Sequence, residues 1–579
     1  MCGILGGNFE GFNYKSGVQA LIHRGPDDQK LAHEKIILGF CRLSIIDLHS
    51  RSNQPMNSRD GRISIIFNGE IYGFKKIRNK LIDEGHEFDT KSDTEVILKS
   101  YIQWGSEFID KIDGMFSIVI FDKNKNKLYL YRDRPGIKPI YYYNQKKHFA
   151  FSSELKGLVQ MVGQKNLEID NSSIYDFLTY SYIPSPKSIY KQIKKLPPSH
   201  RLVYDISNKT IESIEDYWNF VPTQENSLTI DEASNKLKEL VDESVKSQMI
   251  SDVPLGFLLS GGLDSSIVTT SASNLTSQKI QTFTISFDES QKSEEKYASI
   301  IAKKNNTKHR VFSLSSDLTK RLMSNLSNWY DEPHSDTSAV PTFLVSHISK
   351  KYVTVVLTGD GGDELFGGYN RHKNKNRLNY ILSKYSNIKS FLIKFRDTFC
   401  LHTPPYRLIN SILRFFLDDL ELHTKRVGVG GMIKEEKLKY RKYLEIEEDY
   451  DDYWYFRKNW LPELSYRNRI RYLDFKTYMH EAVLAKVDRT SMSVSLEARV
   501  PLLSRNLIEF MFSLPEKVVF HRKELKGLVK YSYKGVLPEI ILSKKKQGFS
   551  VSSEATKSNI PLGINILKKY YSQFLTFLN

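Results

Sequence analysis

The stretch that decides the fold of the second half of this chain is Leu255-Gly-Phe-Leu-Leu-Ser-Gly-Gly-Leu-Asp-Ser-Ser266. Residues 253–259 are mostly apolar and predict a buried strand of a parallel sheet. A glycine turn follows, and the residues from Ser265 onward predict a helix. Backbone N–H groups and the helix dipole at such a turn can hold a phosphate, and Asp264 can bind Mg²⁺. The alternative is an ordinary strand-to-helix turn without a ligand.

Two other phosphate-binding patterns do not fit this turn. It lacks the Gly-Lys-Ser/Thr ending of a Walker loop and the G-x-G-x-x-G of a Rossmann fold. Residues 260–265, Ser-Gly-Gly-Leu-Asp-Ser, instead resemble the phosphate loop of the ATP pyrophosphatases, which cleave ATP between its α and β phosphates. The resemblance implies that the chain activates a substrate with ATP.

The composition is that of a globular protein with more than one domain. Its 579 residues are 40% hydrophobic and 26% charged, and roughly two to four domains are expected at this length. No apolar run approaches the roughly 18 residues of a membrane helix, and the first residues lack the features of a secretory signal. The scattered Cys2, Cys41 and Cys400 exclude a disulfide framework. We expect a cytoplasmic enzyme with no membrane partner.

The net charge of +17 raises the question of nucleic-acid binding. The lysines are spread along the whole chain, apart from short runs such as residues 544–546. We therefore predict a basic, soluble surface and no nucleic-acid partner. An RNA-modifying protein is the alternative, because the same phosphate loop occurs in tRNA-modifying enzymes.

The first part of the chain predicts an α+β sandwich that ends near Tyr217. Alternating apolar segments at residues 63–67, 117–121 and 127–131 are typical of strands separated by turns. Residues 74–84 and 93–104 predict helices. Ser92 would cap the second helix, with Glu95 as its capping-box partner. Together these patterns favour a layered α+β fold.

The second part, residues 229–579, follows a polar linker at 218–228 and predicts a doubly wound α/β sheet. Residues 282–287, 308–312 and 352–357 predict further strands, with a helix at 294–303. The last of these strands ends in Thr358-Gly-Asp-Gly-Gly-Asp-Glu-Leu-Phe-Gly-Gly-Tyr369. Since ligands bind at the carboxyl ends of parallel strands, this acidic turn and the Ser260 turn can face one site. On its own, the acidic turn would more often be a surface loop.

The motifs of the first part point to glutamine chemistry. Cys2 would carry both a thiol and a free α-amine once Met1 is removed, although alone it could be a small apolar residue at a chain end. In order along the chain it is followed by His23-Arg-Gly-Pro-Asp27, Cys41-Arg-Leu-Ser-Ile-Ile-Asp47, Asn68-Gly-Glu-Ile-Tyr72 and Ser92-Asp-Thr-Glu95. Together they resemble the glutaminase domain of class II glutamine amidotransferases, which are N-terminal nucleophile hydrolases.

That resemblance implies a role for each matching residue. Cys2 would be the nucleophile, and Arg42 would bind the α-carboxylate of glutamine. Asn68 and Gly69 would be oxyanion donors, while Glu70 and Asp93 would hold the amino group. The family usually has Asn where this chain has Gly73, a position without a catalytic role. Cys41 and Cys400 match no catalytic position and are expected to be packed thiols.

The motifs of the second part, taken with the first, resemble the asparagine synthetases. They are the Ser260 turn, Asp331-Glu-Pro333, the Thr358 turn, Lys486-Val-Asp-Arg489 and Glu497-Ala-Arg-Val-Pro501. The resemblance implies that Asp264 and Asp363 hold Mg²⁺, that Glu364 contacts the acceptor and adenylate, and that Lys546 covers the pyrophosphate. It also implies ATP contacts from Leu258, Ser260, Gly261, Gly262, Asp264, Ser265, Ser266, Ile285, Thr358, Gly359 and Asp360.

The expected reaction is a glutamine-dependent asparagine synthesis. Cys2 would release ammonia from glutamine, and the second domain would adenylate aspartate with MgATP. The alternative is amidation of another carboxylate, such as a sugar uronic acid or a peptide. Two departures motivate it: the family's Pro-Phe-Leu-Asp is Pro501-Leu-Leu-Ser504 here, and its usual Arg before Lys-x-Gly-Phe is Lys544. An inactive regulatory relative is opposed by the presence of Cys2 and the other expected site residues.

One segment has no assigned chemistry. Residues 373–466 are rich in Tyr, Phe, Lys and Arg and predict helices that flank the synthetase domain. Leu408, Ile412, Phe415 and Phe416 form an apolar face at helical spacing. A partner surface or a homodimer interface is the alternative role for this segment.

Overall fold

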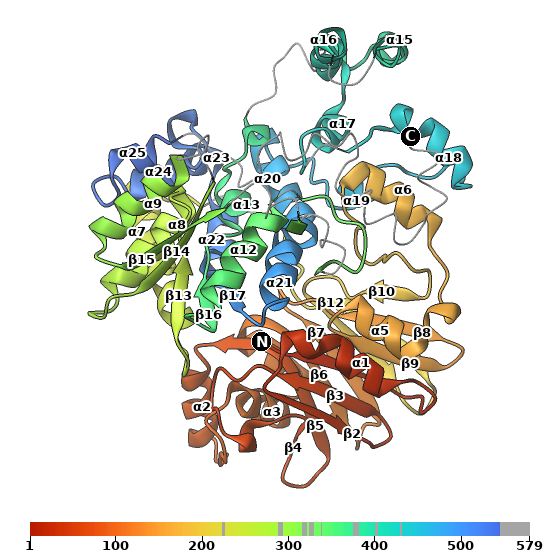
Figure 1. Cartoon of the computed structure of the whole chain (residues 1–579), viewed down its shortest axis with the longest axis vertical. Coiled ribbons are helices and arrows are strands. Elements are labelled where there is room, and N and C mark those ends of the chain that lie inside the picture. The colour runs from red at the N-terminus through yellow and green to blue at the C-terminus, as the bar shows by residue number, and fades with distance from the viewer. Residues whose placement is uncertain are drawn as a thin grey trace.

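The computed structural model describes residues 1–222, 226–287, 293–314, 321–322, 329–336, 338–373, 381–399, 403–428 and 431–544. The first part of the chain, coloured red to orange in Figure 1, lies below the parallel sheet of the second part. Two residues of interest, Cys400 and Lys546, are outside the described ranges. Across these ranges no helix is both long enough and apolar enough to cross a lipid bilayer.

The first part is a sandwich of two antiparallel sheets. The strand order is β10-β8-β9-β1-β3-β2 in one sheet and β12-β11-β7-β6-β5-β4 in the other. The strands of the first sheet are β1 (Gly3–Gly7), β2 (Asp28–Ala32), β3 (Ile37–Arg42), β8 (Tyr141–Gln145), β9 (His148–Ser152) and β10 (Ile193–Lys195). Those of the second are β4 (Met56–Asn57), β5 (Ile63–Tyr72), β6 (Asp113–Asp122), β7 (Lys127–Arg132), β11 (His200–Asp205) and β12 (Thr210–Asp216).

Helices cover the outer face of each sheet, so that four layers result. Helices α1 (Tyr14–Leu21) and α5 (Leu155–Val162) share a buried cluster with the first sheet. Helices α2 (Phe74–Asp83) and α3 (Asp93–Trp104) do the same for the second sheet. A third cluster, which includes Ile4, Phe40 and Ile66, fills the space between the sheets. The predicted α+β N-terminal nucleophile hydrolase sandwich is confirmed.

Only one of the two hydrogen bonds of the predicted capping box forms at the start of α3. The Ser92 hydroxyl accepts from Glu95 N at 3.3 Å, as expected for an N-cap. The Glu95 carboxylate does not return to Ser92 N; it accepts from Thr90 N at 2.7 Å and Asp89 N at 3.0 Å. Because the preceding loop brings these two N–H groups close, Glu95 ties the loop to the helix instead of closing the box.

The second part contains the predicted parallel sheet. Its described strands have the order β15-β14-β13-β16-β17, and every pair is parallel. The strands are β13 (Leu255–Leu258), β14 (Gln281–Phe287), β15 (Lys308–Leu314), β16 (Val355–Leu357) and β17 (Glu497–Arg499). The direction of winding reverses between β13 and β16, which is where an open α/β sheet binds ligands. β16 is shorter than predicted, and β17 had no counterpart in the sequence prediction.

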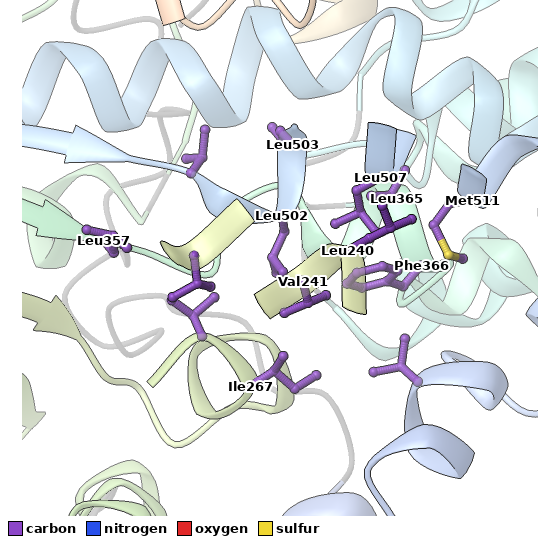
Figure 2. Packing of buried hydrophobic residues seen from close by; sticks show 14 of the residues in the cluster. Leu240, Val241, Ile267, Leu357, Leu365, Phe366, Leu502, Leu503, Leu507 and Met511 are labelled. Carbon is purple, nitrogen blue, oxygen red and sulfur yellow. The ribbon is translucent and has the colours of Figure 1, made fainter. Parts of the chain in front are cut away.

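Helices pack on both faces of this sheet and confirm the doubly wound fold. One face carries α7 (Ile230–Gln248) and α8 (Leu263–Asn274), with Leu240, Val241 and Ile267 facing Leu357 and Leu502 across the core shown in Figure 2. The other face carries α12 (Ala339–Ser349) and α21 (Ala485–Met492). Further helices that the structure describes in this part are α9 (Ser293–Lys304), α13 (Gly362–Phe366), α20 (Tyr466–Lys476), α22 (Arg505–Ser513), α23 (Glu516–Val519), α24 (Gly527–Ser532) and α25 (Glu539–Leu542).

The segment inserted between α13 and α20 contacts both domains: His423 lies 3.5 Å from Asp474 of α20, and the later part of the segment also contacts the sandwich. On α6 (Asn171–Tyr180) of the sandwich, the Tyr175 hydroxyl donates to Asp452 Oδ1 at 2.9 Å, and Asn171 Nδ2 donates to Leu444 O at 3.1 Å. The inserted helices are α15 (Ser386–Arg396), α16 (Pro404–Leu413), α17 (Asp419–Thr424), α18 (Leu438–Tyr443) and α19 (Trp454–Lys458).

In the insertion, α15 and α16 project from the body of the molecule at the top of Figure 1. The apolar face predicted at Leu408 and Ile412 points outward, because these residues are 63% and 41% exposed. α16 buries Ile409 and Leu413 instead. The outward face fits the alternative reading of this segment as a contact surface.

Candidate active sites

The first candidate site surrounds Cys2 at the start of β1. Cys2 N donates to Asn68 Oδ1 at 2.9 Å, and Asn68 is fully buried in β5. Within the described residues, Asn68 Nδ2 has no hydrogen-bond acceptor. A buried donor without an acceptor is costly unless a ligand supplies one. Asn68 therefore fits the expected role of an oxyanion donor beside the thiol.

The residue after Asn68 has to be glycine. Gly69 has φ +153°, and a Cβ there would lie 1.9 Å from Met115 O in the neighbouring strand β6. Gly73, where the family usually has Asn, has φ +66° with open space around it. Glycine and asparagine both tolerate this left-handed conformation. Gly73 in place of the family's Asn therefore leaves the backbone unchanged.

Arg42, the expected ligand of the glutamine α-carboxylate, is buried at the end of β3. Its guanidinium donates to Asp47 O at 2.6 Å, to His49 O at 3.0 Å and to Asn53 Oδ1. These bonds hold the loop that follows β3 close to the Cys2 site. Cys41, its neighbour, is a buried thiol as predicted.

Two buried carboxyl groups complete this site. Asp93, at the start of α3, accepts from Ile71 N at 3.1 Å, and burial raises its pKa to about 6. Burial also raises the pKa of Glu70, with the nearby Asp93 adding to the rise and Arg499 opposing it. Burial likewise raises the pKa of the Cys2 thiol. The structure thus brings Cys2, Arg42, Asn68, Glu70 and Asp93 together around one point.

Residues of the synthetase domain reach this same point, which the sequence reasoning missed. The Met1 α-ammonium lies 2.8 Å from Glu497 Oε2, and both groups are buried. Arg499 donates to Glu497 at 2.7 Å and to Glu70 at 3.1 Å. The Glu-Ala-Arg motif was noted only for its family resemblance. Only the fold brings it against Glu70, because 429 residues separate the two in sequence.

The second candidate site is a cavity of about 1120 Å³ at the carboxyl ends of β13, β14 and β16. Two residues of the sandwich, Ser181 and Tyr182, contribute to its wall. Among the expected ATP and metal ligands, those that line it are Leu258, Ser260, Gly262, Asp264, Ser265, Ile285, Thr358, Gly359, Asp360 and Asp363. Gly261 and Ser266 are not among the described residues that line it.

The Ser260 turn has the geometry of an anion site. Ser260 Oγ accepts from Gly262 N at 3.3 Å and lies 3.1 Å from Ser265 Oγ. Gly262 caps α8 without a side chain, which leaves the first N–H groups of this helix facing the cavity. A Cβ at Gly359 would lie 2.6 Å from Ser265 N, so the Thr358 turn packs directly on the start of α8.

A lysine that carried no sequence motif lies between the two expected metal ligands. Lys526 Nζ is 2.5 Å from Asp264 Oδ2 and 2.6 Å from Asp363 Oδ1. Opposite charge on both sides raises the pKa of Lys526 against the effect of burial. Two carboxylates that converge on one cation also fit a hard divalent ion such as Mg²⁺. The only local signal was a lysine before Gly527, which sequence reasoning passed over.

Glu364, the expected acceptor contact, is buried at the cavity and accepts from the Tyr369 hydroxyl. The Arg371 guanidinium lies 3.8 Å from the centre of the Tyr369 ring and fixes its position. On the opposite wall, Lys486 Nζ lies 3.8 Å from Asp360 and 3.9 Å from Asp336. Both signs of charge therefore surround the space next to Glu364.

The lysine run near the end of the described chain reaches the cavity through Lys544. Its Nζ lies 3.5 Å from Gly261 O and 4.2 Å from the centre of the Tyr297 ring. Nearby, burial raises the pKa of Glu294 to about 7, while Lys544 opposes the rise. The expected pyrophosphate lysine, Lys546, lies outside the described residues, so its role stays a prediction.

A network of buried charges joins the two domains between the sites. Arg24 donates to Glu154 at 2.6 Å and to Asp488 at 2.9 and 3.0 Å. Lys138 lies 3.4 Å from Asp488, and Arg489 lies 2.9 Å from Glu154. Asp488 and Arg489 belong to α21, whose Lys486 lines the second cavity. One helix thus contacts the sandwich and also forms part of the second site.

Comparison with known proteins gives two family matches and several relatives. The glutamine amidotransferase domain family matches residues 1–218, and the asparagine synthase family matches residues 236–565. Asparagine synthetase (glutamine-hydrolyzing) 1 of Bacillus subtilis is 32% identical over 554 residues, 92% of this chain and 83% of the relative. Putative asparagine synthetase (glutamine-hydrolyzing) 2 of Methanocaldococcus jannaschii is 38% identical over 388 residues, 63% of this chain and 73% of the relative.

These matches confirm the resemblance on which the sequence analysis relied. A third relative, asparagine synthetase (glutamine-hydrolyzing) 3 of Bacillus subtilis, is 27% identical over 91% of this chain and 82% of its own length. The two matched families follow each other in the same order as the sandwich and the parallel sheet. The chain therefore belongs to the asparagine synthase family of glutamine-dependent ligases.

Proposed function

We propose that this chain is a glutamine-dependent asparagine synthetase. The Cys2 thiolate attacks the side-chain amide of glutamine, ammonia leaves, and water hydrolyses the thioester to glutamate. In the second domain, the β-carboxylate of aspartate attacks the α-phosphate of ATP and pyrophosphate leaves. Ammonia then attacks the acyl adenylate, which gives asparagine and AMP.

The observation that carries this proposal is the pairing of two complementary sites in one molecule. Cys2 lies beside the unsatisfied donor of Asn68, and the cavity between β13 and β16 has a helix start and two converging carboxylates. Asp264 and Asp363 would hold Mg²⁺, which supplies charge neutralisation for the phosphates when bound. Lys526 offers a further cation to the same phosphates.

The acceptor space also favours aspartate. Aspartate carries an α-carboxylate and an α-ammonium besides its reacting group, and Lys486 and Asp336 provide opposite charges at this wall. Leu503, from the motif that departs from the family, packs on Gly361 in the core, and no residue of 502–504 is among those that line the cavity. That departure is therefore no support for a larger acceptor.

The proposal is tested by the dependence of pyrophosphate release on the acceptor. Purified protein with glutamine and MgATP is offered aspartate, and in parallel sugar uronic acids and peptides. We expect release to rise with aspartate, with asparagine and AMP formed in equal amounts. If release responds to another carboxylate and not to aspartate, the asparagine assignment is wrong and the alternative amidation replaces it.

The Cys2→Ala variant tests the division of labour between the two sites. Without the thiol, glutamine-dependent synthesis is expected to fall to background because no thioester can form. Synthesis from added ammonium salt should continue, since Cys2 has no contact with the nucleotide cavity. Loss of both activities in a folded variant would contradict the separation of the two reactions.

A further inference from the structure

The two candidate sites are joined by a short bonded path through β17. At one end, Arg499 donates to the Glu70 carboxylate at 3.1 Å. At the other end, Thr358 N donates to Arg499 O at 2.9 Å, at the first residue of the turn that lines the nucleotide cavity. A single residue therefore contacts the glutamine-binding carboxylate through its side chain and the nucleotide-binding turn through its backbone.

The Arg499 side chain is fully buried and anchored on three sides. It donates to Glu497 at 2.7 Å on its own strand, and to Gln248 O at 2.7 Å and Ile250 O at 2.6 Å at the end of α7. That end of α7 leads directly into β13 and the Ser260 turn. A guanidinium is suited to this position, because its planar fork can serve several acceptors in fixed directions.

The residues that follow Arg499 pack against the same nucleotide turn. A Cβ at Gly361 would lie 2.5 Å from Leu503 Cγ, and one at Gly362 would lie 2.9 Å from Leu502 Cδ1. The two glycines therefore pack directly against these leucines, and the Thr358–Glu364 turn has little room to move without the segment that follows β17. Because packed interiors transmit small displacements, order in the turn fixes the position of β17.

From this path we infer that Arg499 is a positioning residue that couples the glutamine site to the nucleotide site, so that bound nucleotide strengthens glutamine binding. The inference rests on the proposed function, because it takes Glu70 as a ligand of the glutamine ammonium. Phosphates bound at the Thr358 turn hold β17 in place, and β17 holds Arg499 on Glu70. The supporting electrostatics are consistent with this direction, since Arg499 opposes the rise in the pKa of Glu70 and so favours the charged form that binds an ammonium.

Coupling of this kind is reciprocal, which gives a sharp test. In the Cys2→Ala protein, which cannot turn over glutamine, the dissociation constant of glutamine is measured by calorimetry with and without magnesium and α,β-methylene-ATP. We expect α,β-methylene-ATP with magnesium to lower the dissociation constant of glutamine about fivefold or more, which is a typical size for allosteric coupling. Saturating glutamine should lower the dissociation constant of α,β-methylene-ATP by the same factor.

Arg499→Lys on this background keeps the charge but removes the fork. Both ligands are expected to bind. The ratio of the glutamine dissociation constants measured without and with nucleotide, which is the coupling factor, should fall to about 2 or less. Arg505→Lys is the matched control, since Arg505 also bridges the domains, donating to Asp110 O at 3.1 Å, yet does not contact Glu70. The control should keep the full factor.

Several results would overturn the inference. They are equal glutamine affinity with and without nucleotide in the Cys2→Ala protein, full coupling in Arg499→Lys, or lost coupling in Arg505→Lys. If Arg499→Lys does not fold, Glu497→Gln is used instead, because it weakens the 2.7 Å ion pair between Glu497 and Arg499. Full coupling in Glu497→Gln would also contradict the inference. Failure of either ligand to bind the Cys2→Ala protein at all would instead refute the proposed function.

Discussion

Lys526 is the residue whose position says most about the nucleotide site. Its ammonium lies within 2.6 Å of both Asp264 and Asp363. Without a cation between them, these two carboxylates would repel each other across a partly buried space. If the cavity binds Mg²⁺ and ATP as we propose, Lys526 keeps the two carboxylates in place before they bind and can itself donate to the phosphates.

Replacing Lys526 tests this account. Lys526→Ala is expected to lower kcat for pyrophosphate release by about 10²–10³, the usual loss when one charge-stabilising donor is removed. The exposed Lys517→Ala on α23 is the control and should leave kcat unchanged. Pyrophosphate release under saturating MgATP and aspartate measures both. Equal kcat in the two variants would show that Lys526 is only structural.

The pKa of Asp93 predicts how glutamine use depends on pH. Burial places this pKa at about 6, above the ordinary 3.8, so the carboxylate is lost as pH falls through about 6. If Asp93 holds the glutamine ammonium, as the family resemblance implies, KM for glutamine should rise below that pH, because the ammonium would lose the charged carboxylate. The contribution of Asp93 to stability runs the other way: it is full below about 4 and is lost as pH rises through about 6.

Glutamate release between pH 5 and 8 measures this dependence. Asp93→Asn serves as the comparison, because it cannot ionise and should show a high KM with no inflection near pH 6. A wild-type KM that stays constant from pH 5 to 7 would contradict the assignment of Asp93 as an ammonium ligand.

Among the elements, strand β17 shows why some of the site could not be predicted. It has three residues, Glu497–Arg499, too few for an alternating pattern. Its place at the sheet edge is set by pairing with β16, which lies about 140 residues earlier in the chain. Helix α3 was predicted with its bounds because its periodicity is local, whereas the predicted strand at 63–67 covered only the first half of β5.

The N-cap of α3 gives a prediction at the level of one helix. Ser92→Ala removes the acceptor of Glu95 N and should lower the free energy of unfolding of the sandwich by about 1 kcal/mol. Ser92→Asp keeps an acceptor for Glu95 N, so it should lower the free energy of unfolding by much less. The thermal transition of the sandwich, followed by calorimetry, reports both. An equal effect of the two substitutions would show that the cap is not the cause.

At the scale of the whole molecule, the buried charges between the domains hold the two sites in a fixed relation. Arg24 and Asp488 are buried and doubly hydrogen-bonded to each other. Asp488→Ala should destabilise the docked domains by about 3–5 kcal/mol, because a buried guanidinium loses a partner. Cleavage in the linker at 218–228 by a protease is expected to become faster, which measures the opening.

Glu509→Ala is a suitable control for this interface. Glu509 accepts from Trp218 Nε1 at 2.8 Å but is 35% exposed, so its loss should cost about 1 kcal/mol or less. The double change Arg24→Met with Asp488→Leu should recover only part of the stability lost in Asp488→Ala, because the buried Lys138 still loses Asp488 as a partner. Equal proteolysis of Asp488→Ala and Glu509→Ala would contradict the role of the buried pair.

The sequence was sufficient for the two folds, and many of the residues that it proposed for each site lie near one another, while their roles stay predictions. Motifs around Cys2 and Ser260 are local, and the rule that ligands bind where strand order reverses located the nucleotide site. Contacts between distant segments were out of reach. Arg499 beside Glu70 and α18 beside α6 depend on how the domains dock, which no periodicity records. Lys526 beside Asp264 depends on how two distant segments of the second domain pack together.

The buried ammonium of Met1 sets an order of events in the making of this protein. Its partner, Glu497, is translated almost five hundred residues later, and the docked synthetase domain closes over the chain start. An aminopeptidase can reach Met1 only before that closure. If Cys2 acts as we propose, with its thiol as nucleophile and its α-amine free, Met1 has to be removed before the synthetase domain docks. Protein that docks first would keep the Cys2 amine blocked and should fail to use glutamine.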